Sequence, residues 1–351
     1  MKYSVIQPEV RSAHDSVVGL WPANQPTAQP SRYPWYYLDN PLGPGTVFQL
    51  TRENVTHAPT LVGWTGFGPR RIWHAGESLS AVDHADFVVS RGHRSLLPAL
   101  TLQRRATEYA AAIADVAYGF PNEHAIGIFQ RLGYKPLGRM GRFVKVLRRA
   151  AYIGRKIPVP FLPSIAGSAL DIWAGLPERL AVRRIRAVAD VQWVERFDER
   201  FDAFAARVGN QYRLIGHRDA AFLHWRFRPD QVGRPLIAAV LDRDSKELRA
   251  YAVVIEKEPG VAQFGDFLAG SAQDLGILLD AIVPVLRARG FSSVTALFLG
   301  APWVGQVLQA HGFAFRGAPR VVTIRANPNR VDSSTILQAD NWYMTPADRD
   351  F

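Results

Sequence analysis

Apolar residues in the first half of the chain fall into short runs with the two-residue period of strands and two longer runs with the period of helices. Glycine and proline separate the first strand-like runs, and Gly133 closes the second helical run. The pattern predicts strands at 47–50, 61–67, 72–73, 85–89, 113–118 and 142–147, and helices at 97–112 and 124–132.

The second half of the chain repeats this order. Its pattern predicts strands at 248–256, 261–268, 293–299 and 321–325, and helices at 274–289 and 303–311. Two landmarks keep a nearly constant spacing, because Asp86 and Asp266 are 180 positions apart and Gly133 and Gly312 are 179 apart. An offset this constant over several elements indicates a duplicated α/β unit.

A segment of different composition, residues 150–186, separates the two halves. It combines four prolines with basic clusters and with the aromatic residues Tyr152, Phe161 and Trp173. Two interpretations stay open: the segment is a linker that packs on both halves, or it is a basic amphipathic surface that rests on an anionic membrane.

Composition places the chain among globular proteins. Its 351 residues are enough for two domains, and 48% of them are hydrophobic while 21% are charged. No window approaches the roughly 20 uncharged apolar residues of a membrane span, and residues 1–15 lack the apolar core of a signal peptide. We therefore expect a cytoplasmic protein, peripheral at the inner membrane surface if the linker binds lipid.

The residue types exclude some chemistry and suggest partners. With no cysteine, disulfides, thiolate nucleophiles and thiolate metal sites are excluded, and His217 and His311 lack partners at metal-ligand spacing, so no metal is expected. The formal charge of +11 favours an acidic partner: nucleic acid, anionic lipid, a nucleotide cofactor or an acidic carrier protein. A proteome rich in arginine would explain the same charge without any such partner.

The stretch from Ala85 to Ala110 has the layout of an anion cradle. A short apolar run ends in a basic turn, Arg91-Gly92-His93-Arg94-Ser95, and a helical pattern follows. Unpaired amides at a helix start attract phosphate. Phosphate cradles usually carry two or three glycines and this turn has one, so it is either a modified cradle or one that no longer binds phosphate.

Three motifs carry a resemblance to a known family. They are RYPWYYLDNPLGPG at 32–45, YGFPNEHAIGIFQRLGY at 118–134, and DAAFLHWRFRP at 219–229 followed by DNWYMTPADRDF at 340–351. Together they resemble the tandem GNAT group, acyl-CoA-dependent N-acyltransferases associated with bacterial exopolysaccharide and surface-glycan biosynthesis.

The resemblance implies an α/β (α+β) architecture of two tandem GNAT-like lobes, each a mixed twisted sheet flanked by helices. The implied divisions are an N-terminal lobe at 1–149 that binds the acyl donor, the linker at 150–186, a C-terminal lobe at 187–332 and a tail at 333–351. The second lobe has no basic glycine turn after Asp266-Phe267-Leu268, so its cofactor turn is degenerate and the donor is expected in the first lobe.

The implied donor is acetyl-CoA or a longer acyl-CoA, and an acyl-carrier protein also fits. In this family the pantetheine arm lies beside the fourth strand and the pyrophosphate lies on the turn after it. By residue type, Arg91 matches the leading arginine of that turn, but Arg94 and Leu96 stand where small residues are usual. Asn122 matches the asparagine that contacts pantetheine, or it simply caps the helix that follows. The implied donor site comprises Val88, Val89, Arg91, Gly92, His93, Arg94, Ser95 and Asn122.

Several residues are candidates for proton transfer. Phe129 stands where many GNAT enzymes have a catalytic tyrosine, which leaves Tyr118 as the nearest hydroxyl. Asp86 and His84 are candidate bases predicted to share one face of a regular strand, with Asp83 on the other, unless Asp86 is a structural anchor. The resemblance adds a second set in the tail: Asp348, Asp350 and the terminal carboxylate of Phe351.

Five further residues, Trp35, Tyr36, Asn40, Trp225 and Arg226, either line an acceptor groove, since aromatic faces stack on sugars, or pack between the lobes. The resemblance implies acyl transfer to an amine, such as an amino sugar in surface-polysaccharide assembly, by direct attack on the thioester.

One alternative function is that of a FemAB-like transferase, which takes an aminoacyl group from tRNA. The positive charge of the chain favours this alternative, and the absence of a long helical arm argues against it. Another is a non-catalytic scaffold at the membrane surface, which the altered turn favours and the retention of Arg91, Gly92 and Asn122 opposes.

Overall fold

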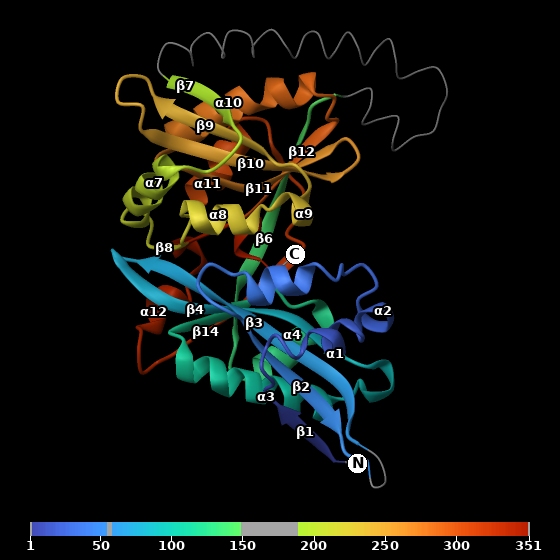
Figure 1. The fold of residues 1–351 in the computed structure, drawn as a ribbon. Coiled ribbons are helices and arrows are strands. Elements are labelled where there is room, and N and C mark those ends of the chain that lie inside the picture. The colour runs from blue at the N-terminus through green and yellow to red at the C-terminus, as the bar shows by residue number, and fades with distance from the viewer. Residues whose placement is uncertain (1, 55–57, 149–188, 350–351) are drawn as a thin grey trace.

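The computed structural model describes residues 2–54, 58–148 and 189–349. They form two lobes stacked end to end, with the last described residues lying between them (Figure 1). The linker and its aromatic residues lie outside the described residues, as do Asp350 and Phe351. None of the described helices is both long enough and apolar enough to cross a membrane.

The first lobe is a twisted sheet covered on both faces. Helices α3 and α4 cover one face, and the segment that contains α1, α2 and a π-helical turn covers the other (Figure 1). Its elements are β1 (Tyr3–Ile6), α1 (His14–Val18), α2 (Trp21–Asn24), the π-helical turn (Pro34–Leu38), β2 (Thr46–Arg52), β3 (Thr60–His74), β4 (Glu77–Val89), α3 (Leu96–Ile113), β5 (Val116–Gly119), α4 (Glu123–Arg131) and β6 (Lys135–Val146).

The second lobe repeats the central order. Strands β9, β10 and β11 form an antiparallel set, and α10 leads to β12, which runs parallel to β11, as α3 leads to β5 beside β4. The second half of the described chain contains β7 (Ala189–Val194), α7 (Glu199–Gly209), β8 (Leu214–Gly216), α8 (Ala220–Arg226), α9 (Pro229–Val232), β9 (Leu236–Asp242), β10 (Leu248–Glu258), β11 (Val261–Ala269), α10 (Ala272–Ala288), β12 (Ser293–Gly300), α11 (Pro302–Ala310), β13 (Ala314–Phe315), β14 (Arg320–Ala326), α12 (Ser333–Ile336) and β15 (Trp342–Met344).

Strands β6 and β14 each pair with strands of the other half of the chain. The first part of β6, Lys135–Met140, pairs with β14, and the rest of it, Gly141–Val146, pairs with β12 in the second lobe. In return β14 lies between β5 and β6 in the sheet of the first lobe. Figure 1 shows β6 running from one lobe into the other. Each lobe therefore contains a strand that the other half of the sequence supplies.

The predicted strands 61–67 and 72–73 are one continuous strand, β3, and β4 begins eight residues before the predicted start at 85. Pro69 had indicated a break there. It is tolerated because β2 stops pairing with β3 at Phe67 and β8 starts at Ile72, so the ladder on that edge requires no N–H from position 69.

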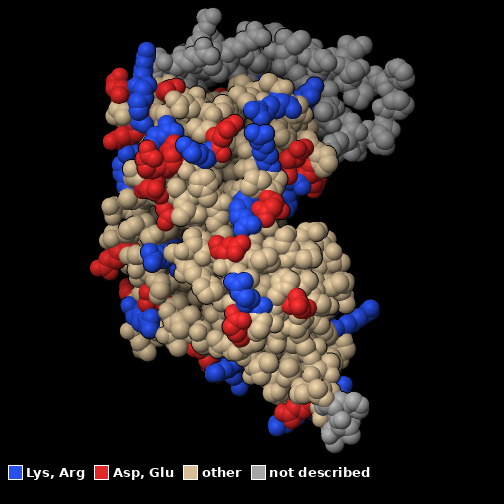
Figure 2. Space-filling view, in the orientation of Figure 1, with Lys and Arg blue, Asp and Glu red and all other residues tan. Residues whose placement is uncertain are grey.

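Charge is unevenly distributed over the surface. In the view of Figure 2, charged side chains gather over the second lobe and at the boundary between the lobes, whereas the visible face of the first lobe carries few. On this face, the charged side chains are therefore concentrated on the second lobe and at the boundary.

Candidate functional site

The first lobe has an opening between two parallel strands. Residues Ala81–His84 of β4 pair with Val116–Gly119 of β5, and β5 then ends. Strand β4 continues to Val89, and over this stretch the described residues place no strand on its β5 side. Ser90 bonds to Val62 of β3, so the backbone groups of Val89 point to the opposite, unpaired side of β4, which we call the opening.

A β-bulge in β4 changes the direction of the side chains beside this opening. The register of β4 with β3 shifts between Trp64–Val88 and Gly66–Ala85, and Asp86 takes a φ of 55°. Asp83 and Asp86 consequently point to the same face, where they accept hydrogen bonds from Tyr36 and Tyr37. The prediction that Asp86 shares a face with His84 is wrong, because it assumed a regular strand.

Asp86 is fixed by ionic and hydrogen-bond contacts. Both of its oxygens lie 3.1 Å from Nη2 of Arg32, and the Tyr37 hydroxyl donates to Oδ2 at 3.0 Å. Asp86 and Arg32 are both buried. These contacts hold the segment before β2 against β4, which favours the structural-anchor interpretation of Asp86 over the catalytic one.

His84 lies on the opposite face, under α4. Its Nε2 is 2.6 Å from the hydroxyl of Tyr134, and its ring lies edge-on to Phe67 and Phe129. Burial lowers the pKa of His84 to about 3, so its imidazole is neutral at pH 7. A group with so low a pKa is a weak base, which does not favour the predicted catalytic role.

The turn after β4 differs from a glycine-rich cradle. Residues Arg91–His93 form a 3₁₀ turn, and a Cβ added to Gly92 would meet nothing within 4 Å. The guanidinium of Arg94 donates from Nε to the carbonyl of Val89 at 2.9 Å and from Nη2 to Asn24 at 3.1 Å. His93 bonds to the hydroxyl of Tyr3. Arg91, Arg94 and Ser95 are exposed at the end of the opening.

Asn122 is the N-cap of α4, as one of the two predictions stated. Its Oδ1 accepts a hydrogen bond from the amide of Ala125 at 3.0 Å. Capping occupies the oxygen and leaves the side-chain amide exposed at the mouth of the opening. Contact with a pantetheine arm stays a prediction.

The corresponding opening in the second lobe is filled by the chain itself. Strands β11 and β12 pair only between Val261–Gln263 and Ser293–Thr295. Beyond that point β15 pairs with Leu299 and Gly300 of β12, and the Tyr343 hydroxyl donates to the carbonyl of Phe267 on β11 at 2.8 Å. The tail thus lies between the diverging ends of the two strands.

Two buried arginines hold the end of this tail. Arg226 donates to the carbonyls of Ala347, Pro346 and Arg349 at 2.8–3.0 Å. Arg218 lies between the carboxylates of Asp266 and Asp348, at 3.1 and 2.5 Å. Because these ion pairs are buried, removal of one partner would leave an uncompensated charge.

The five predicted acceptor residues are buried where the tail and the lobes meet. Trp35 and Trp225 stack on one another, Asn40 bonds to the carbonyl of Pro69, and Arg226 binds the tail. Tyr36 lies between the guanidinium groups of Arg32 and Arg70, 5.4 and 5.3 Å from its ring centroid. This placement favours packing between the lobes over an acceptor groove.

A small cavity of about 90 Å³ lies between the lobes at the end of β5. Tyr118 lines it from β5, Arg70 from β3 and Asp348 from the tail. Tyr118 is buried, and burial raises the pKa of its hydroxyl well above 10, so the hydroxyl stays protonated. Oδ2 of Asp348 is bound by Arg218 and by the amide of Thr345, whereas Oδ1 has no such partner within the described ranges.

His217 also lines this cavity. Its ring stacks on Trp73 at 4.5 Å, and burial lowers its pKa to about 4. In the sequence, His217 has no partner at metal-ligand spacing, and no motif contains Arg70 or Arg218. Only the order of the strands brings these residues to Tyr118, so no local signal could have identified them.

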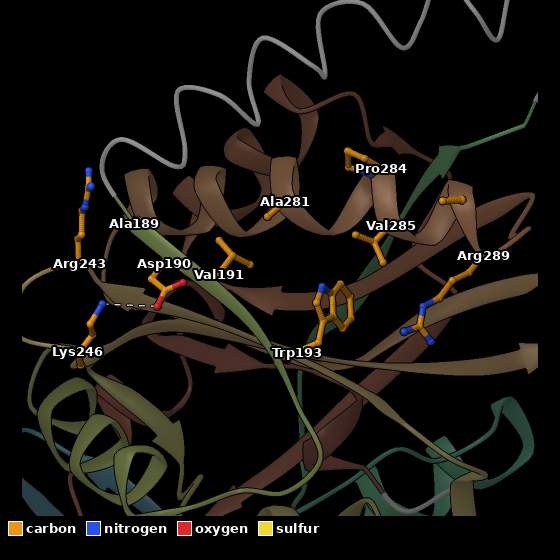
Figure 3. A pocket seen from close by; sticks show the side chains of 11 residues that line it. Ala189, Asp190, Val191, Trp193, Arg243, Lys246, Ala281, Pro284, Val285 and Arg289 are labelled. Carbon is orange, nitrogen blue, oxygen red and sulfur yellow. Dashed lines mark ion pairs between the residues drawn. The ribbon is translucent and has the colours of Figure 1, made fainter.

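Larger hollows lie elsewhere. One of about 760 Å³ is on the outer side of the second lobe, between β7 and α10. Figure 3 shows Trp193 and Val191 facing the helix residues Ala281 and Val285, with Arg289 at one end. None of the predicted site residues lines this hollow.

Within the described part of the chain, no three His, Asp or Glu side chains are grouped to bind a metal.

The overall structure resembles known acetyltransferase structures. A GCN5-related N-acetyltransferase from Kribbella flavida is 13% identical with a TM-score of 0.60, and one from Anabaena variabilis is 10% identical with a TM-score of 0.62. A probable N-acyltransferase from Enterococcus faecalis is 8% identical with a TM-score of 0.62. Each alignment covers 93% of this chain and 73% of the other. No family model and no curated protein matches the chain. The similarity shows a shared fold, the GNAT fold.

Proposed function

We propose that the chain transfers an acyl group from a pantetheine thioester, in the simplest case acetyl-CoA or a longer acyl-CoA, to an amine. One observation carries this proposal: among the described residues no strand pairs with the end of β4 on its β5 side, and Tyr118 of β5 lines a cavity that Asp348 also lines. The second lobe, whose opening the tail fills, would then support the site without binding a donor.

The donor would lie along β4. Its pantetheine arm would pair with the backbone amide of Val89, next to Val88, and the side-chain amide of Asn122 would lie on the other side of the opening. Backbone amides of β4 beside the bulge would polarise the thioester carbonyl, because fixed dipoles stabilise the oxyanion that forms during attack.

The acceptor would enter from the second lobe. Oδ1 of Asp348 would bind the ammonium group and take its proton, so that the amine nitrogen can attack the thioester carbon. The C–N bond forms, the C–S bond breaks, and the sulfur leaves as a thiolate to which the protonated Tyr118 can donate a hydrogen bond. The products are an amide and a thiol, and one proton is released overall.

The size of the cavity limits what it can hold. A volume of about 90 Å³ is a few times that of one water molecule, so it would accommodate the amine-bearing end of an acceptor and not a whole sugar. An amino sugar of surface-polysaccharide assembly remains the acceptor that we propose, with its ring outside the cavity.

Thiol release tests the proposal. Acetyl, octanoyl and palmitoyl thioesters of CoA and of pantetheine would be incubated with the protein and a set of amines, including glucosamine. We expect amine-dependent release of free thiol, reduced about 100-fold or more by Asp348→Asn, in the range of a lost general base. Asp340→Asn, an exposed carboxylate of the same tail, is the control and should keep full activity. No release with any thioester would overturn the function, and full activity of Asp348→Asn would overturn the role of Asp348.

A further inference from the structure

An apolar surface is exposed at the start of α3. Leu96 is 50% exposed and Leu97 is 64% exposed. Of the six large hydrophobic side chains that are exposed in the described ranges, only these two are adjacent in the sequence. They follow directly after the turn at the end of β4, so they lie at the mouth of the opening in the first lobe.

Positive charge surrounds this surface. Residues 90–114 contain four arginines and a single acidic residue, Glu108. All four arginines are exposed. Arg91 and Arg94 precede the two leucines, and Arg104 lies seven residues after Leu97, so it is on the same face of the helix two turns on.

The same turn offers little to a pyrophosphate. Helix starts bind anions through several unpaired backbone amides, but Pro98 has no N–H and the amide of Ala99 already bonds to the carbonyl of Ser95. In the first turn of α3, the amides of Leu96 and Leu97 are the two for which the described residues supply no partner. Gly92 does not adopt a left-handed conformation, and one edge of the Arg94 guanidinium is committed to Val89.

We propose that the surface formed by Arg91, Arg94, Leu96, Leu97 and Arg104 docks an acidic acyl-carrier domain, which presents the acyl group on its own pantetheine arm. This inference rests on the proposed function. A carrier-linked arm has one phosphodiester in place of the pyrophosphate and nucleotide of CoA, so it requires fewer backbone amides.

The chemistry of the surface fits that partner in two ways. Exposed arginines complement an acidic helix and would steer its approach, and the leucines provide an apolar contact that free CoA cannot use. Arg94 is held at the last carbonyl of β4, where the phosphodiester would pass as the arm enters the opening.

Kinetics with two donors that carry the same acyl group test this proposal. The rate of amide formation would be measured with octanoyl-CoA and with octanoyl-carrier protein, for the unmodified chain, Leu97→Glu and Ile113→Glu. Ile113 is 44% exposed at the other end of the same helix, so it controls for adding a charge to α3.

We expect kcat/KM with octanoyl-carrier protein to exceed kcat/KM with octanoyl-CoA by about tenfold or more. The value with the carrier should also fall steeply as the salt concentration rises, because salt screens the electrostatic attraction that steers the two proteins together. Leu97→Glu should lower the carrier value about tenfold and leave the CoA value unchanged, because a carboxylate repels the acidic partner. Ile113→Glu should change neither.

Equal use of both donors by the unmodified chain would overturn the proposal, as would an equal loss with both donors in Leu97→Glu. Loss of binding to vesicles of anionic phospholipid in Leu97→Glu, with unchanged carrier kinetics, would identify a membrane surface and also overturn it. If neither octanoyl-CoA nor octanoyl-carrier protein supports amide formation with any of the three proteins, the proposed function itself would be overturned.

Discussion

The indole rings of Trp35 and Trp225 stack across the boundary between the lobes, with their centroids 5.2 Å apart and an angle of 21° between the planes. Each Nε1 donates to the backbone carbonyl of the other tryptophan, at 2.7 and 2.8 Å. Arg228 and Asp39, close to them in sequence, form an ion pair at 2.7 Å. The hydrogen bonding between the two tryptophans is therefore reciprocal.

This pair should stabilise the arrangement of the lobes. Trp35→Phe and Trp225→Phe each remove one buried donor and leave a carbonyl unpaired, so each should lower the free energy of unfolding by about 1–3 kcal/mol. The double variant should show a coupling of about 0.5–3 kcal/mol in urea denaturation. Trp193→Phe, in the hollow on the outer side of the second lobe, is the control and should change stability by less than either.

Asp86 should contribute to stability and not to the chemical step. Asp86→Asn removes one charge of the buried Arg32–Asp86 ion pair, and we expect a loss of about 3–5 kcal/mol in the free energy of unfolding. At a temperature where the variant is folded, its thiol release should be close to that of the unmodified chain. An intact fold with activity reduced a hundredfold would instead identify Asp86 as the base.

Acid should destabilise the protein through His84. The folded chain holds its pKa at about 3 by burial, whereas an unfolded histidine has a pKa of about 6.5. Between these values the unfolded chain binds more protons, so stability falls as the pH drops below 6.5, by up to about 1.4 kcal/mol per pH unit.

His84→Gln tests this dependence, because glutamine can still bond to Tyr134 but does not titrate. Urea denaturation between pH 7 and pH 4 should show a shallower loss of stability in the variant. Parallel curves for the two proteins would mean that His84 is protonated in the fold.

Gly300 tests whether the tail must fill the second opening. It has a φ of 141°, and a Cβ there would lie 1.7 Å from the carbonyl oxygen of Trp342. Gly300→Ala should therefore displace β15 and with it Asp348, which lowers both stability and amine-dependent thiol release. Gly92→Ala, where a Cβ meets nothing, should leave stability unchanged. Full activity in Gly300→Ala would show that the tail does not position Asp348.

The sequence predicted what depends on local patterns. The spacing of apolar residues predicted α3, α4, α10 and α11. The offset of about 180 residues between corresponding landmarks predicted that the two halves contain similar elements in the same order. The motif 118–134 gave the Asn122 cap correctly, because capping depends on residues three positions apart.

The errors and omissions concern features that long-range contacts decide. A bulge opposite Thr65 reversed the direction of Asp86, and no pattern within β4 indicates it. The exchange of β6 and β14 and the tail in the second opening depend on pairings between residues far apart in sequence. The cavity at Tyr118 is lined by five segments that are far apart in sequence, so most of its residues could not be predicted.

Transfer of a labelled acyl group tests the account most directly. The protein would be incubated with a thioester carrying ¹³C in its acyl group, on CoA and on a carrier protein, and with an amine acceptor, and the products would be examined by mass spectrometry. The account predicts ¹³C in an amide of the acceptor, with the label in that amide much reduced by Asp348→Asn. Label that stays in the thioester with every donor and acceptor would contradict it.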